Sequence, residues 1–416
     1  MFQPILIWLI SLTSIAGVII RPFRLPEAVW AVAGAILLVV LQLISLAETW
    51  SGIGRGTDVY LFLFGMMLLA EVAREELLFD WLATKATRLA HGSAKRLFLL
   101  TYMVGIVVTA FLSNDATAVV LTPAVAAAVR AAKVHKPLPY LLICAFIANA
   151  ASFLLPISNP ANLVIYGKDI PPLLDWLPRY FLPSVLSIGI TYLLLYRTQR
   201  SELQFPLETS IPIPRLSHTG RIAAWGIGAT AIVLLACSAL DIPLGLPTAI
   251  TGAITSVIVL IVAKKKPGVI IRGVSWSVLP LVAGLFVIVE ALNRTGLIRI
   301  ISTFLQHVSA RNMTGAVWGS GIGIALISNG MNNLPAGLIA AETVQSAHVP
   351  EMIRSAILIG VDLGPNLSVT GSLATILWLV ALRREGQTIS AWGFLKLGLV
   401  IMFPALLAAL AAAFIH

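Results

Sequence analysis

The chain has 416 residues, of which 58% are apolar and only 11% are charged, and its mean hydropathy is +0.95. Soluble domains are about 45–50% apolar and about 25% charged, so the composition excludes a water-soluble enzyme and a disordered chain. The net charge of +10 does not indicate a nucleic-acid partner, because the basic residues are spread over short loops between apolar runs, as in membrane proteins.

Ten apolar runs are predicted to cross the membrane, since roughly 20 residues span it. In the first half of the chain they are 3–20, 26–46, 58–73, 138–166 and 176–196. The first run lacks a basic leading region and a cleavage site, so we expect a retained helix. A polar stretch at 197–221 is interpreted as a cytoplasmic linker. The second half contains runs at 222–240, 246–263, 275–293, 353–382 and 391–415.

Two further apolar stretches, 97–129 and 313–345, are each interrupted in the middle by a polar cluster. Each arm is about 15 residues long, short of the roughly 20 that span a bilayer. Broken backbone at membrane depth is tolerated only inside protein or beside a wet cavity. Both stretches are therefore predicted to be re-entrant helical hairpins.

The basic residues predict the orientation of the chain. With this layout, 20 of the 28 Lys and Arg residues fall on one side, including those in loops 74–96 and 264–272, and seven fall on the other. Cytoplasmic loops carry the excess of positive charge. We therefore expect those loops in the cytoplasm and both termini outside.

The chain repeats itself. Leu25-Pro26 and the apolar run after it match Leu246-Pro247, Ser113-Asn114 match Ser328-Asn329, and SNPANLVI at 158–165 matches TGSLATIL at 370–377. An ordered series of this kind predicts a duplication. Each copy, 1–196 and 222–416, holds five crossings and one hairpin, and an odd number of crossings turns the second copy upside-down. The predicted fold is an all-α polytopic membrane protein with two inverted-topology repeats.

Four polar clusters lie at membrane depth. They are SNDAT at 113–117, SNPAN at 158–162, SNGMNN at 328–333 and DLGPNLSVTGS at 362–372. Asn114 and Asn329 are expected to cap the returning helices of the hairpins. The second and fourth clusters break the crossings 138–166 and 353–382. Together they predict a pocket of neutral donors and acceptors, although Asn, Ser and Thr can also simply hold membrane helices together.

Asp115 and Asp362 carry the carboxylates of these clusters. A carboxylate at mid-bilayer costs roughly 2.5–3.5 kcal/mol on insertion scales, so both are candidates for proton coupling. For Asp362 the alternative is that it caps a buried helix end. No phosphate-binding loop or His/Cys metal set is present, so no cofactor or metal site is expected, and energy must come from an ion gradient or a separate partner.

Several segments resemble the arsenite/antimonite efflux permeases, the ArsB family, of the ion-transporter superfamily. They are FLSNDATAVVLTP (111–123), FIANAASFLLPISNPANLVI (146–165), ISNGMNNLPAG (327–337) and IGVDLGPNLSVTGSLATILWLVALRREG (359–386). The resemblance covers nearly the whole chain. It implies export of trivalent arsenic and antimony by proton antiport, with the hairpins and broken helices moving against a scaffold, and in some systems docking to an ArsA-type ATPase on the cytoplasmic face.

The resemblance also implies which residues act. The implied coupling residues are Asp115 and Asp362, and the implied substrate-binding residues are Asn114, Thr117, Ser158, Asn159, Asn162, Asn329, Asn332, Asn333, Asn366, Thr370, Ser372 and Thr375. One position departs from the family, because Asn149 stands where an acid is expected. Proton coupling through that position is in doubt, which shifts the expectation to the two aspartates.

Two other functions compete with arsenite export. A dicarboxylate or citrate symporter of the same superfamily needs sites for an anion and its coupling ion, and Asp115 at a hairpin tip would repel the anion. An intramembrane enzyme needs a nucleophile with a base, or metal ligands, at membrane depth. The six histidines all fall in loops or at the C-terminus, which argues against the enzyme.

Overall fold

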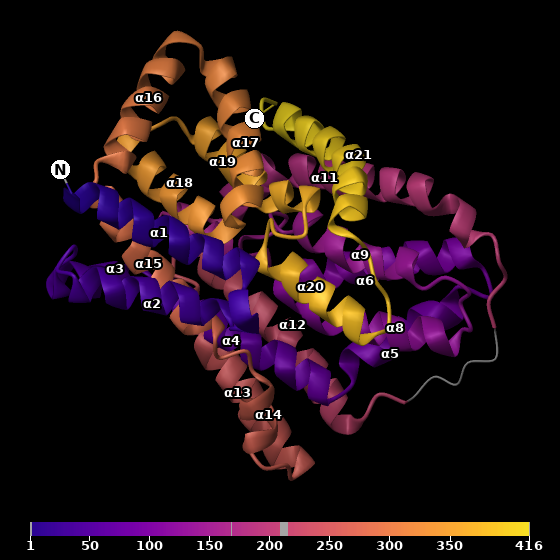
Figure 1. Cartoon of the computed structure of the whole chain (residues 1–416). Helices are drawn as coiled ribbons and strands as arrows, with labels where there is room; N and C mark the ends of the chain where they lie inside the picture. Colours follow the sequence, from indigo (N-terminus) through magenta and orange to yellow (C-terminus); the bar gives the residue numbers. More distant parts are fainter. Residues whose placement is uncertain (1, 168, 209–214, 416) are drawn as a thin grey trace.

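The computed structural model describes residues 2–167, 169–208 and 215–415. Every regular element in these ranges is a helix (Figure 1), which confirms the all-α prediction. Residues 209–214 of the predicted linker, Lys168 and the two terminal residues lie outside the described ranges. The two halves of the chain are described in turn.

The first half begins with five helices, of which α1 and α4 are the longest, continues through the first predicted hairpin and ends with a broken helix and one long helix. Its elements are α1 (Phe2–Ile20), η1 (Pro22–Arg24), α2 (Glu27–Val40), α3 (Leu46–Arg55), α4 (Thr57–Glu75), α5 (Leu78–Leu89), α6 (Ala94–Phe111), α7 (Asn114–Ala116), the π-helical η2 (Thr117–Leu121), α8 (Thr122–Ala131), α9 (Leu138–Ala150), η3 (Pro156–Ser158), α10 (Pro160–Tyr166), α11 (Leu173–Gln199) and η4 (Arg200–Leu203).

The second half follows the same order of long helices, interrupted segment and broken helix. Its elements are α12 (His218–Ala239), α13 (Gly245–Ala263), α14 (Gly268–Gly273), α15 (Val278–Arg294), α16 (Leu297–Arg311), α17 (Met313–Met331), α18 (Asn333–Ala347), α19 (Glu351–Leu363), η5 (Gly364–Leu367), α20 (Leu373–Arg384) and α21 (Ala391–Ala412).

Four helices, α3, α5, α14 and α16, were not predicted. The sequence analysis treated 74–96 as a cytoplasmic loop, which carries five Lys and Arg residues. In the structure α5 buries Leu78, Phe79 and Ala83, whereas Lys85 and Arg88 are exposed and Asp80 is half-buried. A helix that buries only one of its faces is amphipathic and needs no long apolar run. The prediction of a loop was therefore wrong for this segment.

Helix lengths also differ from the prediction. Six described helices are long and apolar enough to cross a membrane, or up to eight if each bent pair is one span, against ten predicted crossings. Helix α2 has only 14 residues, and the crossings 138–166 and 353–382, which were predicted to be interrupted, contain no single helix long enough to be counted. The first arms of the predicted hairpins are longer than expected, since α6 has 18 residues and α17 has 19. Both arms stay helical up to or through the polar cluster.

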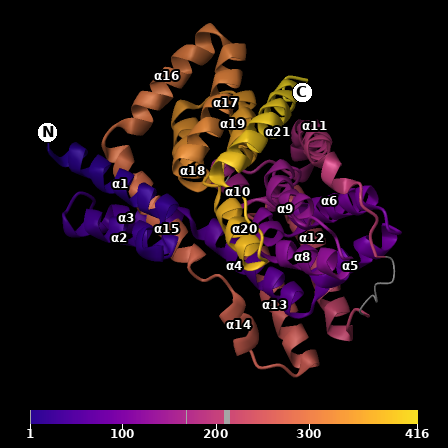
Figure 2. The same cartoon turned by 45° about the vertical axis from the view of Figure 1, so that its right-hand side comes forward.

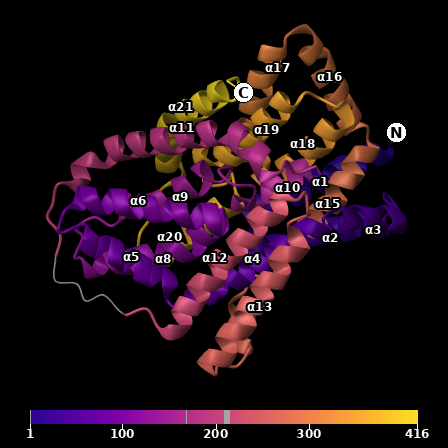
Figure 3. The same cartoon turned by 180° about the vertical axis from the view of Figure 1, so that it is seen from behind.

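The two halves pack against each other along their length. Helix α4 lies along α13, α2 along α15, and α11 along α21. In the α4–α13 pair a Cβ atom at Gly252 would meet the backbone of Gly65, and one at Gly65 would meet the backbone of Thr248, so neither position has room for one. Figures 2 and 3 show the broken helices α9–α10 and α19–α20 in the middle of the molecule, between α4 and α15 on one side and α6 and α11 on the other. The core therefore surrounds the four points where helices are interrupted.

Candidate functional site

The first polar cluster forms the sharp turn between α6 and α8. Ser113 is the N-cap of α7, and its hydroxyl accepts a hydrogen bond from the backbone N–H of Ala116 at 3.1 Å. The predicted cap, Asn114, is the first helical residue instead. Its side-chain oxygen accepts from the N–H of Asp115 at 2.9 Å. The N-cap prediction was wrong by one residue, because the shorter serine side chain reaches the third N–H of the turn.

In the third polar cluster the observed N-cap lies further from the predicted one. Helix α17 continues through Asn329 to Met331, and the N-cap of α18 is Asn332, with φ 74°. The Asn332 side chain accepts from the N–H of Leu334 at 3.2 Å. Asn329 instead donates to the carbonyls of Ala325 at 2.7 Å and Gly364 at 3.0 Å. Asn329 therefore ties the end of α17 to η5 and caps no helix.

The returning parts of the two broken helices begin in the same way. Asn159 caps α10 by accepting from the N–H of Ala161 at 3.0 Å, and Ser372 caps α20 by accepting from the N–H of Thr375 at 3.0 Å. Both caps have extended backbone. Polar side chains at the start of a helix satisfy N–H groups that otherwise have no partner. These two caps bring one side chain from each half of the chain to the centre.

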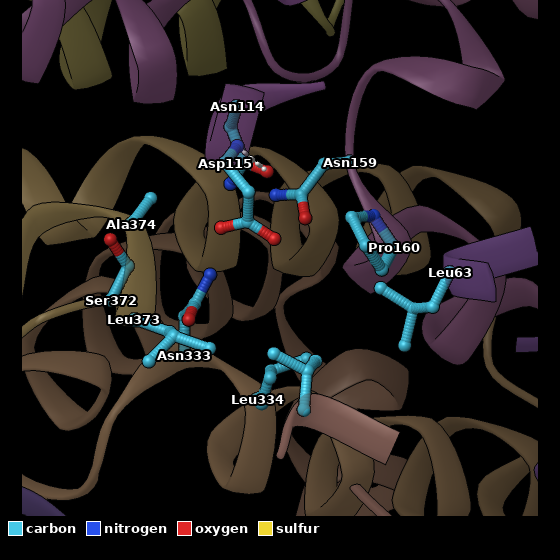
Figure 4. Close-up of a pocket in the computed structure, with 11 residues that line it drawn as sticks. Leu63, Asn114, Asp115, Asn159, Pro160, Asn333, Leu334, Ser372, Leu373 and Ala374 are labelled. Carbon is cyan, nitrogen blue, oxygen red and sulfur yellow. Dashed lines mark hydrogen bonds between the residues drawn. The ribbon is translucent and has the colours of Figure 1, made fainter. Parts of the chain in front are cut away.

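A small pocket lies where the first residues of α10 and α20 meet (Figure 4). The space open to the centre of a water molecule is about 20 Å³, room for about one water molecule. Five of the fourteen predicted site residues line it, namely Asn114, Asp115, Asn159, Asn333 and Ser372. The rest of the lining is Leu63, Pro160, Val278, Leu334, Leu373 and Ala374. The pocket is thus a neutral polar site with one carboxylate and apolar walls.

Asp115 is the one charged side chain among the residues that line the pocket. Its carboxylate points toward Asn159 and Asn333 in Figure 4. Among the described residues, no Lys, Arg or His forms an ion pair with it. It follows the cap of α7, where the positive end of the peptide dipoles favours a negative charge, while burial opposes it.

Asp362 lies behind the pocket rather than in its wall. It is fully buried one residue before the end of α19. Its Oδ1 accepts from Nδ2 of Asn159 at 2.7 Å, whereas its Oδ2 has no hydrogen-bond partner. It caps no helix, so the alternative role considered for it is not observed. Asn159 therefore contacts the pocket on one side and Asp362 on the other.

Asn149 was set aside as a departure from the family, yet it is the centre of a buried hydrogen-bond network. Its Nδ2 donates to Oδ1 of Asn366 at 2.9 Å and Oγ1 of Thr375 at 3.3 Å. Its Oδ1 accepts from the hydroxyl of Ser372 at 3.4 Å. Asn366 in turn donates to the carbonyl of Phe146 at 3.0 Å. The signal in the sequence was an amide inside a wholly apolar run, and its partners come from the other half of the chain.

The remaining predicted residues contact backbone or each other and do not line the pocket. Thr117 shares a hydrogen bond with Thr109 at 2.8 Å, Ser158 donates to the Ala110 carbonyl at 3.1 Å, Asn162 donates to the Ser152 carbonyl at 2.9 Å, and Thr370 donates to the Asn329 carbonyl at 3.1 Å. These bonds connect the interrupted segments. They hold in place the backbone that carries Asn114, Asn159 and Ser372.

Comparison with known proteins shows that the chain is similar to transporters. The family model described as CitMHS, citrate transporter, matches residues 8–361. The arsenical pump membrane protein of Escherichia coli (strain K12) is 28% identical over 97% of this chain and 96% of the relative, and that of Yersinia enterocolitica is 28% identical over 92% and 91%. These matches confirm the resemblance inferred from the four motifs.

Two solved structures have a similar fold. The YdaH transporter of Alcanivorax borkumensis has a TM-score of 0.57 and 14% identity, with 88% of this chain and 86% of that chain covered. MtrF of Neisseria gonorrhoeae, from a class described as antimetabolite efflux pumps, has a TM-score of 0.55 and 16% identity, with 89% and 83% covered. At such identities the likeness concerns the fold alone. Both are helical transporters.

Proposed function

This chain belongs to the CitMHS (citrate transporter) family and is a multi-pass membrane transporter, and from this premise we propose that it exports arsenite and antimonite as neutral trihydroxides. The observation that carries the proposal is the lining of the pocket by Asn114, Asn159, Asn333 and Ser372. Amides and hydroxyls both donate and accept hydrogen bonds. Arsenite at neutral pH is mostly an uncharged trihydroxide, which needs such partners and no cationic clamp.

The size of the pocket supports a small solute. A space of about 20 Å³ for water-sized centres suits a molecule with four heavy atoms after modest opening. Drug-sized ligands occupy clefts of about 300–1,000 Å³. A tricarboxylate such as citrate would need a much larger opening of the same site.

The second candidate is a proton- or sodium-coupled citrate or dicarboxylate transporter, which the description of the family model favours. An anion with two or more charges requires basic partners or bound cations when it leaves water. The described pocket lining contains no Lys, Arg or His and does contain Asp115. This charge pattern repels an anion, so arsenite export is the better supported function.

We propose that protons are the coupling ions and that Asp115 and Asp362 carry them. A carrier that exports a neutral solute against its gradient needs a group that is protonated in one facing state and releases its proton in the other. Asp115 lines the pocket, and Asp362 contacts it through Asn159. The site draws on interrupted segments of both halves, which supports an elevator-type movement of the hairpins 97–129 and 313–345 with the broken helices.

The proposed arrangement keeps the inverted repeats 1–196 and 222–416 and the linker 197–221. It places the chain in the inner membrane with both termini outside, so that the basic loops, and an ArsA-type ATPase if one docks, are cytoplasmic. Each half contributes the cap of its broken helix to the pocket, Asn159 from the first and Ser372 from the second, and one residue of its hairpin, Asn114 and Asn333. This pairing supports a pseudo-symmetric site between the repeats.

Transport into everted membrane vesicles tests the proposal. Arsenite should accumulate when the vesicle interior is acidified, and collapsing the proton gradient with an ionophore should stop accumulation. Citrate in large excess should not compete. Accumulation of labelled citrate without arsenite transport would replace the proposal with the second candidate.

A further inference from the structure

Nine of the eleven residues that line the pocket lie at the starts of four helices of the interrupted segments. They are Asn114 and Asp115 of α7, Asn159 and Pro160 at the start of α10, Asn333 and Leu334 of α18, and Ser372, Leu373 and Ala374 at the start of α20. The remaining two residues, Leu63 of α4 and Val278 of α15, come from helices outside these segments. One of them belongs to each half of the chain.

Leu63 and Val278, called the wall residues below, bound the pocket with apolar side chains. Leu63 is 4% exposed and Val278 is 9% exposed, so both are part of the packed interior. Figure 4 shows Leu63 beside Pro160, across the pocket from Ser372. A leucine or valine side chain neither donates nor accepts a hydrogen bond, so the wall residues cannot hold the hydroxyl groups of a solute. Their contribution to the pocket is its shape.

The helices that carry the wall residues are held by close backbone contacts. On α4, a Cβ atom at Gly65 would meet the backbone of Thr248 in α13. On α15, a Cβ atom at Gly284 would meet the backbone of Ala31 in α2. Small residues allow membrane helices to approach this closely. Both wall residues therefore lie on tightly packed helix pairs, one pair involving α4 and the other α15.

We propose that Leu63 and Val278 are specificity-determining residues, which limit the transporter to solutes about as small as a trihydroxide. The inference rests on the proposed function and extends it. In the proposed movement, the interrupted segments carry the solute past α4 and α15, which stay in place. A solute enclosed by the polar side chains passes the wall residues. A solute that protrudes from the polar side chains collides with Leu63 or Val278, and the loaded segments cannot move.

The other apolar residues of the lining do not have this role. Pro160, Leu334, Leu373 and Ala374 belong to the same helix starts as the polar lining residues, so they move together with the bound solute. Their positions relative to the solute stay the same throughout the movement. Among the residues that line the pocket, the wall residues alone meet the solute from helices that stay in place.

The excluded solutes are dihydroxyarsines with a bulky substituent. Phenyldihydroxyarsine keeps two hydroxyl groups of arsenite and carries a six-carbon ring in place of the third. Its hydroxyl groups can bond to the same amides and hydroxyl of the pocket, but the space of about 20 Å³ leaves no room for the ring. Leu63→Ala removes three side-chain carbons and Val278→Ala removes two. Together they free about the volume that the ring adds.

Transport of both solutes into everted vesicles tests the proposal. The readout is the proton-driven rate for phenyldihydroxyarsine divided by that for arsenite, each corrected for the rate that remains after the gradient is collapsed. This ratio does not depend on the amount of folded protein. Leu63→Ala and Val278→Ala should each raise it by at least about tenfold, since one methylene in an apolar pocket changes discrimination by roughly 10–200-fold. The double variant should raise it further.

Matched controls separate the wall from general packing. Leu69→Ala and Val282→Ala make the same changes on α4 and α15, at buried positions outside the pocket, and both should keep the wild-type ratio. An unchanged ratio in wall variants that still transport arsenite would overturn the proposal. An equal rise in the controls would do the same, because it would show a general loosening of the fold.

The remaining outcomes are also decisive. If the alanine variants do not fold, Leu63→Val, which is one methylene smaller, should still raise the ratio. Loss of transport in Leu63→Val as well would show that Leu63 is only structural and would overturn the proposal, as would a wild type that transports both solutes equally well. A wild type that transports no arsenite would instead contradict the proposed function.

Discussion

The amide of Asn159 donates to the carboxylate of Asp362 at 2.7 Å, across a separation of 203 residues. Asn159 also lines the pocket and caps α10. One side chain therefore connects the pocket, the start of a returning helix and a fully buried acid. A change in the protonation of Asp362 alters the hydrogen bonding available to Asn159.

This contact predicts an asymmetry between two substitutions. Asn159→Ala should lower the free energy of unfolding by about 1–3 kcal/mol, because it leaves a buried acceptor of Asp362 without its donor. Asp362→Asn retains an oxygen that can accept the same bond and should cost much less. Thermal melting in detergent measures both. Equal, small losses would show that the contact does not hold the two halves together.

Asp115→Asn should retain arsenite exchange but lose the pH dependence of transport. The amide keeps hydrogen-bonding groups in the pocket. The carboxyl group, for which a proton and the substrate compete, is removed. Vesicle flux across the neutral pH range measures this, with Asp80→Asn, the same acid-to-amide change on α5 and outside the pocket, as the control. Normal proton-driven transport by Asp115→Asn would exclude Asp115 as a coupling residue.

Asn149→Ala should destabilise the protein by about 1–3 kcal/mol, since Asn366 loses its buried donor and Thr375 loses a partner. Arsenite transport should also fall, because Ser372 contacts both Asn149 and the pocket. Cys144→Ala, on the same helix and fully buried, removes atoms without disturbing this network. If Cys144→Ala reduces transport as much as Asn149→Ala, general packing of α9 rather than the network explains the loss.

Glu76 predicts a pH dependence of stability at the end of α4. Burial opposes its charge, but hydrogen bonds from Lys265, Thr219 and Ser217 outweigh that effect and hold the pKa of Glu76 below its ordinary value. A lowered pKa in the folded state means that the stabilisation is full above the ordinary glutamate pKa of the unfolded chain and is lost as the pH falls from there through the lowered pKa of the folded state.

Melting temperature should therefore fall from neutral to acid pH by a larger amount in the wild type than in Glu76→Gln. Lys265→Met, which removes the strongest partner of Glu76, should behave like Glu76→Gln. Identical pH profiles for all three proteins would show that Glu76 does not contribute.

Several features could be predicted from the sequence because they depend on local pattern. Polar residues such as Asn159, Asn333 and Ser372 stand out in apolar runs, and burying them without partners is costly, so a polar site at membrane depth follows. The interruptions of 138–166 and 353–382 could be read from Pro, Gly and Asn. The helical class follows from the length of the apolar runs.

The tertiary structure decided which of these polar side chains face the pocket and which contact backbone. Asn162 is one turn from Asn159, yet it donates to the Ser152 carbonyl instead of lining the cavity. Asn149 meets Asn366 and Ser372 only because α9 packs beside η5 and α20. Periodicity along the chain sets the face of a helix, but what that face contacts depends on residues about 200 positions away. Helix α5 was missed for the same reason, since its apolar side is stabilised by packing against α6 and α8 and not by its own sequence.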